Sequence, residues 1–380
     1  MFFLVTRLSK SMKKHNKNIR VSTVWAIAFI VVCAWGGSVH AWNPFDCFKC
    51  PVAAAPATRV EDIKNSSDPE YHEGVVWAAI SLPSLKDQDE YAIPDDDAVG
   101  RYLLFGIYDG HGKYDRSGGW GENKGKQVAQ YVKRRMCDLC CGYLCEHSDD
   151  DMRDLLNMFH LMHGQINAEI ISQPGLDTAG STATTVLIDR KLRTITIAHT
   201  GDSLCIIWDR DKKVQYATLA HTPECDEELV RVYRAGGCVT KAAGSWRVNG
   251  LLEMTRSFGD AQITCEQARD LFLARQKDLG EGARRGMLIP IEYETQDISS
   301  VSDGTPIVSS EPDVTTIPFP DGGKIVLASD GLWNTVNAET IAEIANESGI
   351  EHVAYDLREE AASCGVRDDV SVIAIFLPHT

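Results

Sequence analysis

The stretch Phe105-Gly106-Ile107-Tyr108-Asp109-Gly110-His111-Gly112 joins an apolar run to a turn that carries a carboxylate and an imidazole. The run that leads into this turn, Tyr102–Tyr108, is rich in branched and aromatic residues, as is typical of a β-strand. Gly110 lets the backbone carbonyl beside Asp109 approach a bound ligand closely. The stretch therefore predicts a strand that delivers polar groups to the edge of a sheet.

Acidic residues recur at the ends of other predicted strands. Asp202 and Asp330 each follow a strand in a glycine-containing turn, and the pair Asp368-Asp369 stands directly before the last strand. Asp89 precedes the short run Tyr91-Ala92-Ile93. A single Asp-Gly is most often a solvated turn, but several carboxylates at one sheet edge would repel one another in a poorly solvated site. A divalent cation would remove this repulsion, and oxygen ligands select magnesium or manganese over zinc.

His111 lies two residues after Asp109. Taken alone, such a histidine is more often structural than catalytic. At this position, however, it would reach the leaving oxygen of a phosphoryl group without itself binding the metal.

The body of the chain alternates short β-rich runs with amphipathic helices. Strands are expected at Tyr102–Tyr108, Ala183–Ile188, Thr194–His199, Leu204–Trp208, Lys324–Ala328 and Val370–Phe376. Helices are expected at Gly125–Cys141, Asp150–Ile171, Glu227–Gly236, Ala338–Ser348 and Glu351–Cys364. Several strands follow one another directly between Ala183 and Trp208, which predicts antiparallel hairpins and an α+β layering rather than a doubly wound parallel sheet.

The composition is that of a globular chain, since 44% of the 380 residues are hydrophobic and 24% are charged. The formal net charge is −16, yet the first twenty residues hold six basic and no acidic side chains. The remainder is more acidic still, with 32 basic against 54 acidic residues. Such a body repels nucleic acid, so we expect no nucleic-acid partner, and it suits a protein that holds metal cations.

The N-terminal segment 1–42 joins this basic stretch to the uncharged run Val21–Trp42. Its densest part, Val24–Trp35, has the length of a signal-peptide core and is short for a membrane span. Two interpretations stay open, a cleaved secretory signal and an uncleaved single-pass signal anchor with its basic end in the cytosol. Both place the chain at a membrane or in the secretory pathway. The alternative is an organellar address or a cytoplasmic chain.

Residues 43–70 contain Pro51 and Pro56 and show no amphipathic period, which predicts a linker. Cys47 and Cys50 form a CxxC pair in this linker, and four more cysteines lie between positions 137 and 145. They would form a zinc site, disulfides in an oxidising compartment, or free thiols in the cytosol. The spacing does not choose among these.

The polar turns and their neighbours resemble, in order, the motifs of the metal-dependent serine/threonine protein phosphatases of the type 2C class (the PPM family). The matching stretches are Phe105–Gly112, Gly180–Ala183, Gly201–Ser203, Glu228–Gly237, Arg247–Leu251, Thr255–Asp260, Ala328–Trp333 and Asp368–Val372. One such motif would be a weak signal. Their common order between about Tyr71 and Leu377 makes the resemblance specific.

The resemblance implies a catalytic domain over 71–380, built as two antiparallel β-sheets packed as a sandwich and flanked by helices on both outer faces. It also implies two Mn²⁺ or Mg²⁺ ions bridged by Asp109. The ligands implied by position are Asp89, Asp109, the carbonyl of Gly110, Asp330 and Asp368, with Asp177 for a third ion.

The activity implied by the resemblance is hydrolysis of phosphoserine and phosphothreonine in proteins. A water activated by the two metals would attack phosphorus, and His111 would protonate the departing oxygen as general acid. Phosphoproteins would be the substrates, and we expect a monomer. The chemistry needs no cysteine nucleophile, so the cysteines are interpreted as structural.

Three departures from the family pattern stand out. The position of the arginine that clamps the substrate phosphate is Ser84, so Lys86, the nearest basic residue, is the candidate phosphate-binding group. The usual Asp-Asn before the last strand is Asp368-Asp369, and an insertion at about 262–303 is either surface decoration or a flap that selects substrates. Loss of the arginine leaves open a weakly catalytic pseudophosphatase that binds phosphoproteins. A small-molecule phosphatase is a further alternative.

Overall fold

The computed structural model describes residues 70–72, 75–94, 101–112, 123–147, 154–176, 178–242, 244–264 and 303–379, all within the compact unit Pro51–Thr380. The N-terminal segment 1–42, the linker up to residue 69, Asp177 and most of the insertion at about 262–303 lie outside these residues. The domain boundaries drawn from the sequence therefore stay predictions.

One sheet contains six antiparallel strands in the order β1-β2-β15-β14-β8-β9. Its strands are β1 (Glu70–His72), β2 (Val75–Leu82), β8 (Leu204–Trp208), β9 (Val214–Ala217), β14 (Lys324–Ala328) and β15 (Val370–Phe376). Strands from the two ends of the described chain thus pair with each other, because Val76 of β2 lies opposite Phe376 of β15.

The other sheet contains seven strands in the order β12-β5-β4-β6-β7-β13, with β3 paired to β4. Its strands are β3 (Asp89–Ala92), β4 (Tyr102–Gly112), β5 (Ala179–Ser181), β6 (Ala183–Asp189), β7 (Thr194–Thr200), β12 (Phe258–Gly259) and β13 (Asp313–Pro318). All of its pairs are antiparallel. A separate two-stranded hairpin is formed by β10 (Val239–Ala242) and β11 (Ser245–Val248).

The two sheets pack face to face around an apolar core. Trp77 of β2 meets Phe105 of β4 edge to face, with ring centroids 5.4 Å apart, and both side chains are buried. Branched side chains from both sheets, among them Ile197 and Ile373, fill the rest of this layer. The predicted antiparallel sandwich is confirmed.

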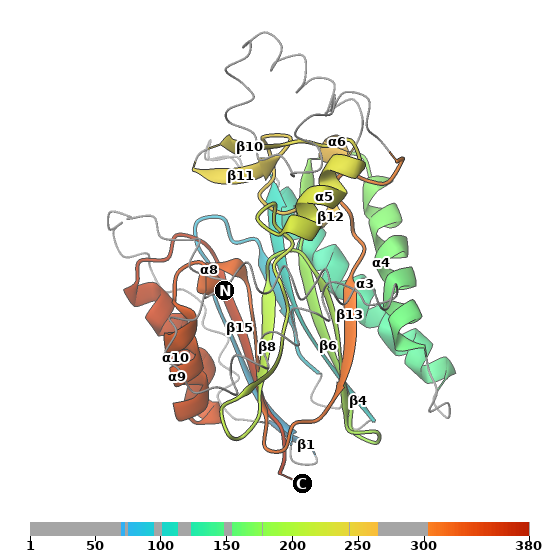
Figure 1. The fold of residues 1–380 in the computed structure, drawn as a ribbon. Coiled ribbons are helices and arrows are strands. Elements are labelled where there is room, and N and C mark those ends of the chain that lie inside the picture. Colours follow the sequence, from blue (N-terminus) through green and yellow to red (C-terminus); the bar gives the residue numbers. More distant parts are fainter. Residues whose placement is uncertain are drawn as a thin grey trace, which may run out of the picture. The chain divides into compact units, whose positions relative to one another are not determined.

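Helices cover the outer faces of both sheets (Figure 1). The six-stranded sheet carries α9 (Ala338–Glu347) and α10 (Ile350–Ser363), and the seven-stranded sheet carries α3 (Lys124–Glu146) and α4 (Leu155–Ile171). The inner face of α3 buries Val128, Val132 and Met136, the four-residue spacing from which a helix was predicted. The shorter helices are α5 (Asp226–Arg234), α6 (Ala261–Thr264) and α8 (Asp330–Trp333).

The sequence patterns missed several strands, among them the apolar β2, the short buried β5 and strands whose residues are polar or exposed. The edge strand β13 ends in Pro318 and is half exposed, so its sequence resembles a loop. Pairing with β7 along its whole length makes it a strand. The helix expected from Asp150 is α4, which begins at Leu155 because the side chain of Asp154 caps it by accepting the N–H of Asn157 at 2.9 Å.

Two further sequence expectations concern the membrane and the cysteines. In the ranges that the structure describes, there is no helix with the length and apolarity needed to span a membrane. The eight cysteines in these ranges are all thiols without a disulfide. Among them Cys140 is buried in α3, and burial raises the pKa of its thiol, which makes it unreactive. Cys47 and Cys50 lie outside the described residues.

His163 is a fully buried histidine on the inner face of α4. Its Nδ1 lies 3.2 Å from the carbonyl oxygen of Ser310 and 3.2 Å from the hydroxyl of Thr200, and its ring packs 4.8 Å from the ring of Phe258. Burial lowers the pKa of His163 to about 3. The native protein therefore keeps this side chain neutral in mild acid.

We expect the free energy of unfolding to fall as the pH is lowered from 6.5 toward about 3. In this window the unfolded chain binds a proton at His163 and the native chain does not, so stability is lost at up to about 1.4 kcal/mol per pH unit. Urea unfolding of wild type and His163→Gln at several pH values measures this slope. Equal slopes for the two proteins between pH 4 and 6 would contradict the prediction.

Candidate metal centre

Two of the predicted metal ligands face each other across a strand pair. The register of β3 and β4 places Asp89 directly opposite Asp109, where like charges destabilise a sheet unless they are neutralised. Asp89 is buried, and its Oδ2 accepts a hydrogen bond from the hydroxyl of Ser329 at 2.6 Å. Its Oδ1 is buried and has no hydrogen-bond partner in the described part of the chain. One oxygen of this carboxylate is thus left for a ligand.

The six-stranded sheet brings two more predicted ligands to the same region. Asp330 begins α8 directly after β14, and Asp368 stands two residues before the neighbouring strand β15. Ser329 precedes Asp330 and donates to Asp89, so it joins the ends of the two sheets. The four carboxylates therefore come from both sheets and meet at one end of the sandwich.

The pKa values of these carboxyl groups show that they influence one another. Burial raises the pKa of Asp109 well above its usual range, and the charges of Asp89 and Asp330 add to this effect. Burial and the neighbouring carboxylates likewise raise the pKa of Asp330. Burial, followed by the charge of Asp369, raises the pKa of Asp89 to about 7. The site is thus short of positive charge.

These side chains fit divalent cations in charge and in donor type. No three His, Cys, Asp or Glu side chains in the described ranges are already arranged as a complete ligand set. The raised carboxyl pKa values and the unpartnered oxygen of Asp89 nevertheless favour a cation at this point. All the donors are oxygens, which suits Mg²⁺ or Mn²⁺. Asp177, predicted for a third ion, lies outside the described residues.

Gly110 occupies a position with no room for a side chain. A Cβ there would lie 2.3 Å from the carbonyl oxygen of Gly125, in the first turn of α3. The N–H of Gly110 donates to the carbonyl of Gln88 at 3.3 Å. Close packing between β4 and α3 therefore requires this glycine, and its role as a carbonyl ligand stays a prediction.

His111 is bonded to a carboxylate that the sequence did not assign to the site. Its Nε2 lies 2.6 Å from Oδ2 of Asp260, which is buried and also accepts the hydroxyl of Ser257 at 2.5 Å. Burial lowers the pKa of His111, but the charge and hydrogen bond of Asp260, together with the charge of Asp202, outweigh burial and the pKa is raised. Nδ1 of His111 has no hydrogen-bond partner among the residues that are described. Asp260 therefore favours the cationic imidazole.

Asp202, in the turn after β7, is a second carboxylate near His111 that was recognised only as a strand-end residue. Burial raises the pKa of Asp202 to about 6, although the charge of His111 opposes this. Its Oδ1 is also buried without a partner in the described ranges. Asp202 and Asp260 both follow a glycine with positive φ, and this shared Gly-Asp pattern is the signal that could have identified them.

Lys86 reaches the carboxylates from the loop between β2 and β3. Its Nζ lies 2.6 Å from Oδ2 of Asp368. Burial lowers the pKa of Lys86, but Asp368 and the carboxylates behind it raise the pKa further, so the side chain stays charged. The hydroxyl of Ser84 accepts the N–H of Lys86 at 3.0 Å. The structure thus places Lys86 in the centre, beside a predicted metal ligand.

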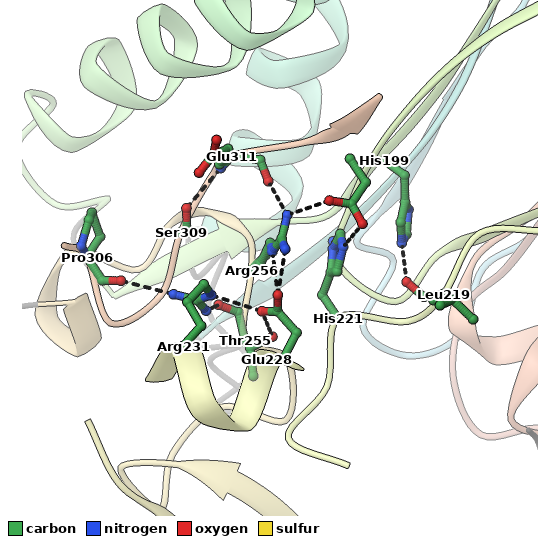
Figure 2. Close-up of polar contacts among 12 residues, drawn as sticks. His199, Leu219, His221, Glu228, Arg231, Thr255, Arg256, Pro306, Ser309 and Glu311 are labelled. Carbon is green, nitrogen blue, oxygen red and sulfur yellow. Dashed lines mark hydrogen bonds and ion pairs between the residues drawn. The ribbon is translucent and has the colours of Figure 1, made fainter. Parts of the chain in front are cut away.

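A network of ion pairs fixes the segment that leads to Asp260 (Figure 2). Nε and Nη2 of Arg256 donate to Oε1 of Glu228 at 2.9 and 2.5 Å. Glu228 is buried, and its Oε2 accepts from Nε of Arg231 at 3.0 Å and from the hydroxyl of Thr255 at 2.6 Å. The segment before β12 is thereby held against α5.

The same network extends from Arg256 to His221 (Figure 2), and His221 in turn contacts the turn that carries Asp202. Nη1 of Arg256 donates to Oδ1 of Asp313 at 2.9 Å, and Oδ2 of Asp313 lies 3.2 Å from Nε2 of His221. Nδ1 of His221 accepts the N–H of Gly201 at 3.1 Å. One guanidinium thus helps to position both carboxylates that flank His111.

Replacing Arg256 by Lys should lower the free energy of unfolding by about 3 kcal/mol, since one ammonium group cannot bond Glu228 and Asp313 together and weakens the pairing of the buried Glu228 carboxylate. Urea unfolding near pH 7 measures this loss. The control is Arg210→Lys, because the pair of Arg210 with Asp321 is exposed and should contribute less than about 1 kcal/mol. Equally small losses for the two variants would show that the network does not hold the segment.

The fold and the acidic end of the sandwich define a two-sheet protein suited to metal-dependent phosphoryl chemistry. The family described as Protein phosphatase 2C matches residues 104–370, and the chain belongs to this family. The resemblance found in the sequence motifs is thereby confirmed.

Relatives among curated proteins span most of the chain. Over 277 residues the chain is 27% identical to "Protein phosphatase 1K, mitochondrial" of Xenopus laevis, covering 72% of this chain and 60% of that protein. Over 345 residues it is 28% identical to "Probable protein phosphatase 2C 11" of Arabidopsis thaliana, covering 85% of this chain and 76% of that protein. The chain thus spans about 60% of the length of the Xenopus protein.

Solved structures share the fold. A sex-determining protein of C. elegans matches with a TM-score of 0.56 and 20% identity over 81% of this chain and 66% of that chain. A phosphatase of Toxoplasma gondii matches with a TM-score of 0.54 and 18% identity over 81% of this chain and 94% of that chain. At these identities the likeness shows the fold alone.

Proposed function

We propose that this chain is a metal-dependent phosphatase that hydrolyses phosphoserine and phosphothreonine in proteins. The observation that carries the proposal is the meeting of carboxylates from both sheets beside a histidine whose pKa is raised by a buried aspartate. Membership of the Protein phosphatase 2C family supports the reaction class. Two relatives that are named protein phosphatases support a protein substrate.

The residues that would hold two Mn²⁺ or Mg²⁺ ions are Asp89, Asp109, Asp330 and Asp368, with the carbonyl of Gly110. When bound, the ions would neutralise phosphoryl charge and lower the pKa of water. The carboxylates give this end of the sandwich a negative charge that attracts the ions, and β3, β4, β14 and β15 fix where that charge lies. A third ion at Asp177 stays a prediction.

His111 would serve as the general acid. Its Nε2 is bonded to Asp260, which favours the protonated ring, so Nδ1 is the nitrogen left to give a proton to the serine or threonine oxygen that departs. Lys86 would contact a phosphoryl oxygen, because its ammonium already lies among the predicted metal ligands. As a point charge it would orient the phosphate less strictly than a guanidinium does.

A phosphate-release assay with the full-length chain tests the proposal. We expect inorganic phosphate to be released from a phosphothreonine peptide with Mn²⁺ present and not with EDTA. Nucleotides and sugar phosphates should react more slowly than the peptide. Tight peptide binding without phosphate release would instead indicate a pseudophosphatase, and faster reaction of nucleotides would indicate a small-molecule phosphatase.

The N-terminal segment 1–42 bears on where the protein acts. Two relatives are named mitochondrial, which supports the organellar alternative for this segment. Membrane anchoring, secretion and the monomeric state remain predictions from the sequence. Identifying the N-terminal residue of the mature protein in membrane and soluble fractions distinguishes an anchor from a cleaved segment.

A further inference from the structure

We infer that Asp369 and Asn123 are positioning residues, which hold the loop Ser84–Asp89 in the conformation that presents Lys86 to the substrate phosphate. The inference rests on the proposed function and deepens it. Neither residue is a predicted metal ligand. Each forms hydrogen bonds with different groups of the loop backbone.

Asp369 holds the N–H groups of the loop. It is 2% exposed, and its Oδ1 accepts the N–H of Ser84 while its Oδ2 accepts those of Gln88 at 2.5 Å and Asp89 at 3.3 Å. A carboxylate can accept on both oxygens, whereas an asparagine would turn its NH₂ group toward one of these donors. The aspartate found where the family usually has asparagine therefore makes a contact that asparagine cannot make in full.

Asn123 holds the carbonyl groups of the same loop. Its Nδ2 donates to the carbonyl oxygens of Lys86 at 2.6 Å and Asp87 at 3.1 Å. Its Oδ1 accepts from the side chain of Gln88 at 3.0 Å and, as the N-cap of α3, from the N–H of Lys126 at 3.2 Å. One amide therefore ties the loop to the first turn of α3.

The loop needs this support because its backbone is strained. Asp87 has a φ of +46°, a left-handed conformation that is unfavourable for a residue with a side chain. Asn123 bonds the carbonyl of Asp87 itself, and Asp369 bonds the N–H of Gln88, the next residue. Both contacts therefore act at the strained point.

The strained turn sets where the ammonium of Lys86 lies. Lys86 directly precedes Asp87, and its Nζ lies 2.6 Å from Oδ2 of Asp368. The N–H of Asp369 in turn donates to Oδ1 of Asp368 at 3.0 Å. The side chain of Asp369 therefore orients Lys86 through the loop, while its backbone N–H contacts Asp368 and is kept in any variant.

The variants Asp369→Asn and Asn123→Asp test the inference in the full-length, Mn²⁺-loaded protein. Asp at position 123 keeps the acceptor that caps α3 but cannot donate to the two carbonyls. For both variants we expect the inhibition constant of inorganic phosphate to rise about tenfold, the equivalent of one lost charge-assisted hydrogen bond, while kcat changes less than about threefold. An unchanged inhibition constant in both variants would overturn the inference.

A double-variant cycle separates positioning from a general loss of stability. If Asp369 acts by placing Lys86, Asp369→Asn combined with Lys86→Met should bind phosphate no more weakly than Lys86→Met alone. Fully additive losses would overturn the inference. The control is Asp189→Asn. Asp189, the last residue of β6, is buried and also accepts two turn N–H groups, but it lies opposite Tyr102, at the end of β4 that is remote from Asp109. It should lower stability and leave phosphate binding unchanged.

Amide hydrogen exchange gives a readout that does not depend on catalysis. In Asp369→Asn the amides of Ser84, Gln88 and Asp89 should exchange at least about tenfold faster than in wild type. Wild type that releases no phosphate from peptides would overturn the proposed function, and with it the role of the loop toward a substrate. Active wild type with unchanged exchange and phosphate binding in Asp369→Asn would overturn the positioning role alone.

Discussion

Asp330→Asn should lower kcat for a phosphothreonine peptide by at least about 10³, because Asp330 is a predicted metal ligand and loss of its charge would remove several kcal/mol of transition-state stabilisation. The substitution keeps the size of the side chain at the start of α8. It removes a carboxylate whose pKa is raised by burial and by neighbouring carboxylates. Steady-state kinetics at saturating Mn²⁺ measure the loss.

The same substitution should have the opposite effect on the stability of the metal-free chain. Removing one of several carboxylates that repel each other should raise the free energy of unfolding in EDTA by about 1 kcal/mol near pH 7. Urea unfolding in EDTA measures this gain. Asp321→Asn is the control, since Asp321 pairs with Arg210 at the surface and its loss should change neither quantity appreciably. Full activity of Asp330→Asn would remove Asp330 from the metal centre.

Gly180→Ala should lower kcat by about 10² or more with a smaller change in KM, which is the range expected for loss of a general acid. A Cβ on Gly180 would lie 2.2 Å from Oδ2 of Asp260 and 2.5 Å from Nε2 of His111. The methyl group would therefore occupy the space in which these two side chains meet. It would also lie 2.5 Å from the carbonyl oxygen of Phe258 in the neighbouring strand.

Gly164→Ala is the matched control for this substitution. Gly164 lies on the exposed face of α4, and a Cβ there would meet nothing within 4 Å. We expect an unchanged kcat and a stability gain of about 0.5–1 kcal/mol, because alanine has the higher helix propensity. If His111 acts with Asp260, adding His111→Gln to Gly180→Ala should cause little further loss of kcat. Wild-type kcat in Gly180→Ala would show that the His111–Asp260 contact is not needed.

The sequence was most informative where a strand is buried on both faces. The bounds predicted for β8, β14 and β15 agree with the structure to the residue, because these strands are mainly apolar and almost entirely buried, and polar turns close them. The polar edge strand β13 carries no such pattern. It exists because β7 offers it a partner, which local sequence does not show.

By itself the sequence determined that an α+β body of antiparallel strands would carry carboxylates at strand ends, since apolar runs and the turns that end them are local features. Only the tertiary structure placed Asp89 opposite Asp109, bonded His111 to Asp260, and brought Asp369 to the loop around Lys86. These contacts join residues separated by as many as 285 positions, so they depend on strand register and on which polar groups become buried together. Register and burial are decided by the packing of the whole sandwich, and no short stretch of the chain encodes them.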